Sequence, residues 1–139
     1  GVGGGITGGD RAVRLAIEAE NQGAFGVVVN APISDEVISR IKQVVDIPVI
    51  ATIVSERMDI RSRMEAGADF LNVSGAAATP QIVRSIRAQF PDVPILATGG
   101  PNDETILKTI RAGANAITYS PPSNGELFAD IMQKYRGKL

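Results

Sequence analysis

The sequence repeats itself at a spacing of 46 residues, and this repeat limits the folds that the chain can adopt. Over residues 46–135 the two copies align without a gap. The Ala-Gly-Ala triplet at 66–68 recurs at 112–114, and the Ala-Thr pair at 51–52 recurs at 97–98. A partial third copy lies upstream, where only glycine-rich sequence precedes Thr7-Gly8-Gly9, so we expect this copy to lack its first strand. Tandem copies of this kind are typical of folds built from repeated supersecondary units.

Short apolar runs alternate with helical patterns along the whole chain. The runs are too short for helices and are typical of strands buried on both faces of a sheet. The five predicted strands cover residues 25–30, 49–54, 70–74, 95–98 and 116–119. The six predicted helices follow Asp10, Ser34, Ser55, Thr79, Asn102 and Ser123. Strict alternation predicts a parallel sheet with crossover helices.

Tandem strand–helix pairs indicate an α/β fold of the (β/α)8 TIM-barrel type. A full barrel takes about 250 residues and eight strands, whereas this sequence has 139 residues and five clear strands. We therefore expect a single α/β domain over residues 1–139 that corresponds to the C-terminal five to six units of an incomplete barrel. The alternative is an open, flavodoxin-like sheet. Because an incomplete barrel exposes strand edges, we also expect a homo-oligomer.

Cysteine and histidine are both absent from the sequence. Within these residues this excludes disulfides, thiolate nucleophiles and histidine general bases. The net charge of −1 provides no electrostatic attraction for nucleic acid or an anionic membrane. No apolar run approaches the length of about 20 residues that spans a bilayer, and residues 1–9 lack a signal-peptide pattern. We therefore expect a cytoplasmic protein with neither a nucleic-acid nor a membrane partner.

Polar residues lie at the carboxyl ends of the predicted strands, where parallel α/β folds place their active sites. Asn30 ends the first run, Asn72 and Ser74 lie in the third, and Thr98 ends the fourth. Amide and hydroxyl groups at these positions can hydrogen-bond a sugar hydroxyl or a carbonyl group. We therefore predict that these four residues bind substrate.

The Ile-Leu-Ala-Thr-Gly-Gly segment at 95–100 and the Ala-Ile-Thr-Tyr-Ser segment at 116–120 resemble the last two strands of phosphate-binding TIM barrels. The nearest such families are the 2-keto-3-deoxy-6-phosphogluconate aldolase group and its ribulose-phosphate-binding neighbours. In them a Thr-Gly-Gly turn and a small-residue turn hold the substrate phosphate, since glycine lets the backbone approach and a helix N-terminus adds amide donors. The resemblance implies phosphate contacts at Gly99, Gly100 and Ser120. The alternative is that these glycines only turn the chain into a helix.

Glu56 is the candidate for proton chemistry, because it is the only carboxylate within two residues of a predicted strand end. A buried carboxylate suits proton abstraction next to a carbonyl group, whereas the alternative is an acidic residue in the first turn of a helix. Lys42 and Lys108 fall within predicted helices, so we do not expect a Schiff-base aldolase from this segment alone. No carboxylates pair at metal-ligand spacing, so no metal site is predicted, and a magnesium ion would need the phosphate of the substrate as a ligand.

The pattern as a whole predicts lyase or isomerase chemistry on a small phosphorylated carbonyl or sugar compound. Two alternatives remain open: a non-catalytic barrel that binds a phosphorylated metabolite, and a scaffold without a ligand.

Overall fold

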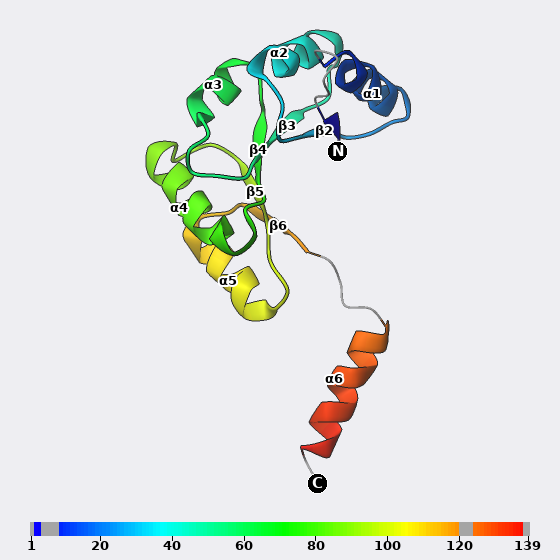
Figure 1. Ribbon diagram of the computed structural model, residues 1–139, viewed down its shortest axis with the longest axis vertical. Helices are drawn as coiled ribbons and strands as arrows, with labels where there is room; N and C mark the ends of the chain where they lie inside the picture. Colours follow the sequence, from blue (N-terminus) through cyan, green and yellow to red (C-terminus); the bar gives the residue numbers. More distant parts are fainter. Residues whose placement is uncertain (1, 4–8, 120–123, 138–139) are drawn as a thin grey trace.

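A single sheet of six parallel strands forms the centre of the protein, and the computed structural model describes residues 2–3, 9–119 and 124–137 (Figure 1). The strands are β1 (Val2–Gly3), β2 (Val27–Asn30), β3 (Val49–Ile53), β4 (Phe70–Val73), β5 (Ile95–Thr98) and β6 (Ala116–Thr118). The helices are α1 (Asp10–Asn21), α2 (Asp35–Val44), α3 (Ile60–Glu65), α4 (Thr79–Gln89), α5 (Asp103–Ala112) and α6 (Asn124–Arg136), with a 3-10 turn, η1 (Ala76–Ala78), before α4.

Each strand pairs with the next strand in the chain, in the order β1-β2-β3-β4-β5-β6. Right-handed crossovers between neighbouring parallel strands place the helices on the same face of the sheet, and α1 to α5 follow one another along an arc around the strands (Figure 1). Val29, Ala51, Leu71 and Ile95 are neighbours in register on this outer face, and all four are buried. On the opposite, inner face the alternate residues of β2 to β5 are exposed or half-buried, Thr52 excepted.

The sequential strand order excludes the flavodoxin-like alternative, in which the strands follow the order 2-1-3-4-5. Sequential parallel strands with helices on the outer face are the arrangement of a TIM barrel, which closes with eight strands. The five predicted strands all form, with ends that differ by no more than two residues. The expectation that the first strand is lost is wrong, because Val2–Gly3 forms a short strand that pairs with Val29 and Asn30 of β2.

The starts of the helices agree with the predictions at some positions and differ at others. Ser34 caps α2 as predicted, since its hydroxyl oxygen accepts from the Val37 amide at 3.3 Å. The third helix begins later than predicted, because the Asp59 carboxylate caps α3. Ser55 instead accepts from the amide two residues ahead, which forms a local turn. Thr79 is the first residue of α4 rather than its cap, and Ser123 lies outside the described residues.

Hydrogen bonds at the amino ends of the strands reproduce the 46-residue repeat. The Asp69 carboxylate accepts from the Val49 amide at 2.9 Å. At the equivalent place in the second copy, the Asn115 side-chain oxygen accepts from the Ile95 amide at 2.9 Å. In each copy a long cationic side chain donates to the same oxygen: Lys42 donates to the Asp69 carboxylate, and Arg87 donates to the Asn115 side-chain oxygen. These contacts hold neighbouring strands together at one end, and the opposite ends are the ones that carry functional loops in this architecture.

Candidate functional site

The four predicted substrate-binding residues lie on the same face of the sheet, at the carboxyl ends of three strands. Asn72 pairs in register with Leu96, so Ser74 and Thr98, two residues further on, are neighbours on the inner face. The Ser74 amide still donates to the Ile53 carbonyl at 2.9 Å, which continues the ladder beyond β4. Asn30 ends β2 on the same face and is exposed.

Two further threonines complete this set. Thr52 pairs in register with Asn72, and Thr118 pairs with Thr98. The sequence contained a signal for both, because the 46-residue repeat relates Thr52 to Thr98 and Asn72 to Thr118. We call Asn30, Thr52, Asn72, Ser74, Thr98 and Thr118 the inner-face polar group.

Hydrogen bonds within the inner-face polar group are long. The Asn72 amide nitrogen donates to the Thr52 hydroxyl at 3.4 Å, and the Thr98 hydroxyl donates to the Val73 carbonyl at 3.5 Å. Side-chain hydrogen bonds of these types are usually shorter, near 2.7–3.0 Å. An amide has two donors and two acceptor sites in total, so Asn72 keeps capacity to bind a ligand. The group is uncharged and offers both donors and acceptors.

The Thr-Gly-Gly turn follows Thr98 directly. The Gly99 amide donates to the Thr118 carbonyl at 2.7 Å, so this amide belongs to the sheet and is not available to a phosphate. A Cβ atom on Gly99 would lie 2.5 Å from Ile117, and one on Gly100 would lie 2.6 Å from the Thr105 hydroxyl. Gly100 also has a φ of +80°. Packing and backbone conformation are therefore sufficient to require glycine at both positions.

The N-terminus of α5 lies next to this turn and carries two acidic residues. Asn102 caps the helix by accepting from the Thr105 amide at 3.0 Å. Asp103 and Glu104 occupy the first turn, and both are exposed. Their negative charge offsets the attraction that a helix N-terminus has for an anion. A phosphate contact at this edge of the sheet would therefore depend on the backbone of Gly100. Ser120, the third predicted phosphate contact, lies outside the described residues.

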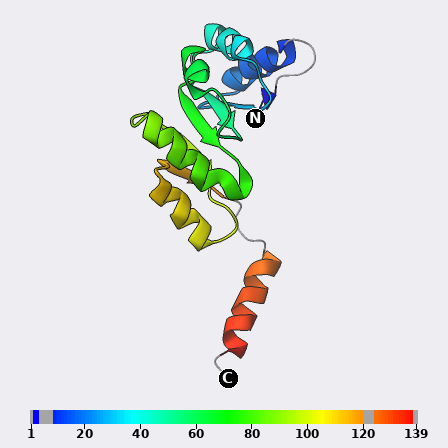
Figure 2. The same cartoon turned by 60° about the vertical axis from the view of Figure 1, so that its left-hand side comes forward.

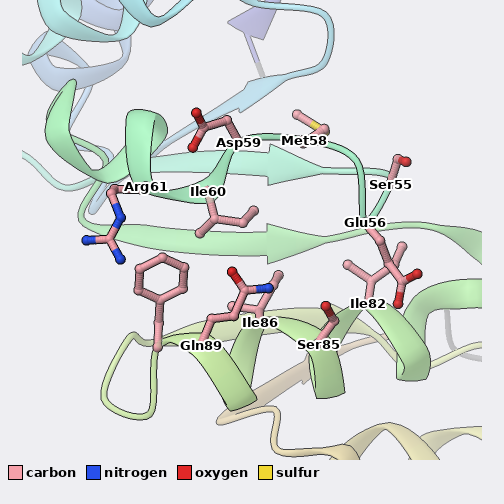
Figure 3. A pocket seen from close by; sticks show the side chains of 11 residues that line it. Ser55, Glu56, Met58, Asp59, Ile60, Arg61, Ile82, Ser85, Ile86 and Gln89 are labelled. Carbon is pink, nitrogen blue, oxygen red and sulfur yellow. The ribbon is translucent and has the colours of Figure 1, made fainter.

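Glu56 lies in the turn between β3 and α3, four residues before α3 begins, so it is not in the first turn of that helix. Its side chain is exposed and lines a pocket of about 330 Å³ between α3 and α4, where it points toward Ile82 (Figure 3). Ser85 and Gln89 of α4 line the same pocket. Because α4 covers the outer face of the sheet, the structure does not bring Glu56 together with the inner-face polar group.

The described lysines all lie on helices, as predicted for Lys42 and Lys108. Lys42 forms an ion pair with Asp69 at 2.6 Å, at the amino end of β4, and Lys134 pairs with Asp130 on α6. Lys138 lies outside the described residues. Within residues 2–3, 9–119 and 124–137, acidic side chains form no group of three or more that could hold a metal ion. In the same ranges, no helix has the length and apolar character to cross a membrane.

No protein-family model matches the sequence, and a search of curated proteins finds no match. Among solved structures, one described as native KDPGal matches with a TM-score of 0.62 and 22% identity, over 87% of this chain and 55% of that chain. A mandelate oxidase matches with a TM-score of 0.67 and 20% identity, over 78% of this chain and 46% of the oxidase. A cube-shaped protein cage, designed by fusing symmetric oligomeric domains, matches with a TM-score of 0.65 and 19% identity, over 99% of this chain and 56% of the cage chain.

The chain thus spans about half the length of the solved structures that it matches. At these identities the matches describe the fold. The sequential parallel strands, the helices along the outer face and the similarity to these barrel proteins lead to one conclusion: the chain has a partial TIM-barrel type fold.

Proposed function

We propose that this chain binds a small phosphorylated carbonyl or sugar compound across the inner face, at the carboxyl ends of the strands. The observation that supports this proposal is the inner-face polar group, in which uncharged amides and hydroxyls from neighbouring strands share one face. Ligand sites of small molecules combine apolar surface with a few such polar groups. Half-buried Ile50, Phe70 and Leu96 supply the apolar surface on the same face.

Each part of the site then has a separate role. Asn72, Ser74 and Thr98 would hydrogen-bond the hydroxyl and carbonyl groups of the ligand. Gly100, two residues beyond Thr98, would place its backbone against the phosphate, together with Ser120 as the resemblance implies. The solved neighbours support a small oxygen-rich ligand, since one mandelate oxidase structure is described with benzoyl-formic acid, a small keto acid.

Calorimetric titration tests this proposal. Dihydroxyacetone phosphate and ribose 5-phosphate are titrated into the protein, with dihydroxyacetone and ribose as unphosphorylated controls. We expect binding of a phosphorylated compound that weakens about tenfold in Asn72→Ala, because a hydrogen bond of about 1–1.5 kcal/mol is lost. Gln133→Ala, an exposed amide on α6, should leave the affinity unchanged. Absence of binding by every compound, or equal weakening by both variants, would contradict the proposal.

Lyase or isomerase chemistry is a second candidate, favoured by the position of Glu56 three residues beyond the carboxyl end of β3. Since Glu56 does not lie with the inner-face polar group, the compound would react in the pocket between α3 and α4. There Glu56 would remove a proton next to the carbonyl group, and a magnesium ion would be held chiefly by the substrate phosphate. Exchange of solvent deuterium into the compound measures this step. We expect exchange that is abolished in Glu56→Gln and retained in Glu65→Gln, whose side chain lies at the end of α3. Exchange that survives Glu56→Gln excludes this base, and binding without exchange supports a non-catalytic binding protein.

A further inference from the structure

The C-terminal helix α6 carries an apolar stripe that no described residue covers. Leu127, Phe128, Ile131 and Tyr135 are 45%, 66%, 61% and 60% exposed, and none of the 13 residues of the helix is buried. Their spacing places them on one side of the helix. Both views show α6 standing apart from the sheet and from the other helices (Figures 1 and 2). Contiguous apolar surface of this kind usually marks a contact site in a folded protein.

A second apolar surface lies on α5 and β6. Leu107 and Ile110 are exposed on α5, about one turn apart. Ile117 of β6 is half-buried, and Tyr119, two residues further on, is exposed. Residues two apart along a strand direction point to the same face of the sheet. We call Leu107, Ile110, Ile117 and Tyr119 the acceptor surface.

The internal repeat relates the α6 stripe to a helix that is already packed on the sheet. Ile82 and Ile86 of α4 are buried over the sheet. The residues 46 positions later are Phe128, which belongs to the stripe, and half-buried Met132, which lies beside it on α6. Five residues separate β4 from α4, and five residues separate β6 from α6. In the first copy of the repeat this arrangement lets α4 contact the strand that precedes it. The equivalent surface in the second copy is the one that contains Ile117.

We propose that α6 docks on the acceptor surface of a second copy of this chain, and that the two copies exchange this helix reciprocally. In the structure α6 does not lie on its own α5 (Figure 2). Reciprocal exchange makes the two contacts identical, which gives a closed two-fold dimer, and exchange of an identical element is a common route to such dimers. This proposal does not depend on the ligand proposed above.

The size of the two apolar surfaces fits a stable dimer. An aromatic side chain buries about 150–250 Å² when it is fully covered. Because Phe128 and Tyr135 are 66% and 60% exposed, the two pairs in a reciprocal dimer would bury about 400–600 Å². Leu127 and Ile131, with the facing acceptor residues, bring the total to roughly the 1,000 Å² that a specific protein interface needs.

Engineered cysteines test the exchange directly, because the 139 residues contain no cysteine of their own. Ile110→Cys and Ile131→Cys are produced as separate chains that differ in tag length, mixed at equal concentration, unfolded, refolded together and oxidised. We expect a disulfide between the two different chains, resolved on a non-reducing gel and located by mass spectrometry of the linked peptide. In the matched control, Gln133→Cys replaces Ile131→Cys and places the thiol away from the stripe, so we expect about tenfold less of the linked product. Equal linking by the two variants overturns the proposal.

A double variant separates exchange from docking within one chain. In Ile110→Cys/Ile131→Cys, exchange predicts linked dimers, whereas a disulfide confined to single chains means that α6 docks on its own α5 and overturns the proposal. Absence of any disulfide overturns it as well.

Sedimentation equilibrium gives an independent measurement: Ile131→Asp should raise the dimer dissociation constant at least about tenfold, with an unchanged circular dichroism spectrum. A dimer that is insensitive to Ile131→Asp overturns the proposal, and so does a wild-type monomer.

Discussion

At the scale of single residues, Arg87 joins the end of α4 to the segments around β5 and β6. Its guanidinium donates to the carbonyl oxygens of Gly113, Pro91 and Val93 at 2.7–2.8 Å, and to the Asn115 side-chain oxygen at 2.7 Å. Arg87→Ala removes this donor from the part-buried carbonyl oxygens of Gly113 and Val93. We expect the free energy of unfolding, measured in urea, to fall by about 1–3 kcal/mol.

Arg84→Ala is the matched control for this prediction. Arg84 lies on the same helix, is exposed and donates to Gln81 at 3.2 Å. Its removal should change stability by no more than about 0.5 kcal/mol. If both variants lose equal stability, the loss comes from α4 itself and the bridging role of Arg87 is wrong.

Gly23 and Gly100 distinguish two reasons why a position requires glycine: a strained backbone conformation and a lack of space for a Cβ atom. Both have positive φ angles, +87° and +80°, but a Cβ on Gly23 meets nothing within 4 Å, whereas one on Gly100 would lie 2.6 Å from Thr105. Gly23→Ala should therefore lower the free energy of unfolding by about 1–2 kcal/mol through backbone strain alone. Gly100→Ala should cause the same strain and lower the free energy of unfolding by a further amount of about 1–3 kcal/mol, because the new Cβ atom overpacks against Thr105. Thermal unfolding checks both, and equal losses would show that the Thr105 contact relaxes freely.

The sequence predicted which polar residues lie at the strand ends better than it predicted which of them share one face of the sheet. Asn72, Ser74 and Thr98 were identifiable because polar residues at the ends of apolar strands are unusual, and the structure places them on one face. The side-chain direction of Glu56 was not predictable, because it depends on where α3 begins. A cap at Asp59 instead of a start after Ser55 leaves Glu56 in a turn that faces α4.

At the scale of helices and strands, prediction was accurate where local chemistry decides the outcome. The apolar runs of β2 to β6 are bounded by glycine, proline or polar residues, so their ends were found within two residues. β1 was missed because two residues carry no periodic pattern. It exists through pairing with Val29 and Asn30, which is a contact distant in the sequence. A short strand that forms only through pairing with another strand cannot be predicted from the pattern of its own residues.

The start of α5 provides a test at this scale. The Asn102 side chain accepts from the Thr105 amide at 3.0 Å, and the Thr105 hydroxyl interacts with the Asn102 backbone in return. Asn102→Ala removes an acceptor from the exposed end of the helix, so we expect a loss of about 1 kcal/mol in chemical denaturation. Asn102→Asp retains the oxygen acceptor and should restore most of this stability. An aspartate variant as unstable as the alanine variant would contradict the capping role.

At the scale of the whole molecule, the six described strands form an open sheet with helices over one face, not a closed barrel. That the barrel is partial was predictable from the number of strands. The repeat identifies the strand–helix unit from which the fold is built, and a barrel needs eight such units. The position of α6 was not predictable, because its amphipathic pattern specifies an apolar face without specifying which surface covers it. The open sheet leaves the inner face accessible, and the proposed ligand site depends on this access.

Two neighbouring valines of β2 test whether the inner face is open in solution. Val29 is fully buried on the outer face, whereas Val28 points to the inner face and is half-buried. Threonine has nearly the shape of valine, so each Val→Thr substitution mainly adds a hydroxyl group. Val29→Thr should lower the free energy of unfolding by about 1–3 kcal/mol, because its hydroxyl is removed from water, and Val28→Thr should lower it by less than about 1 kcal/mol, because water still reaches that face. Equal losses in urea denaturation would mean that a covering surface excludes water from the inner face, and the ligand site proposed there would then be closed in the free protein.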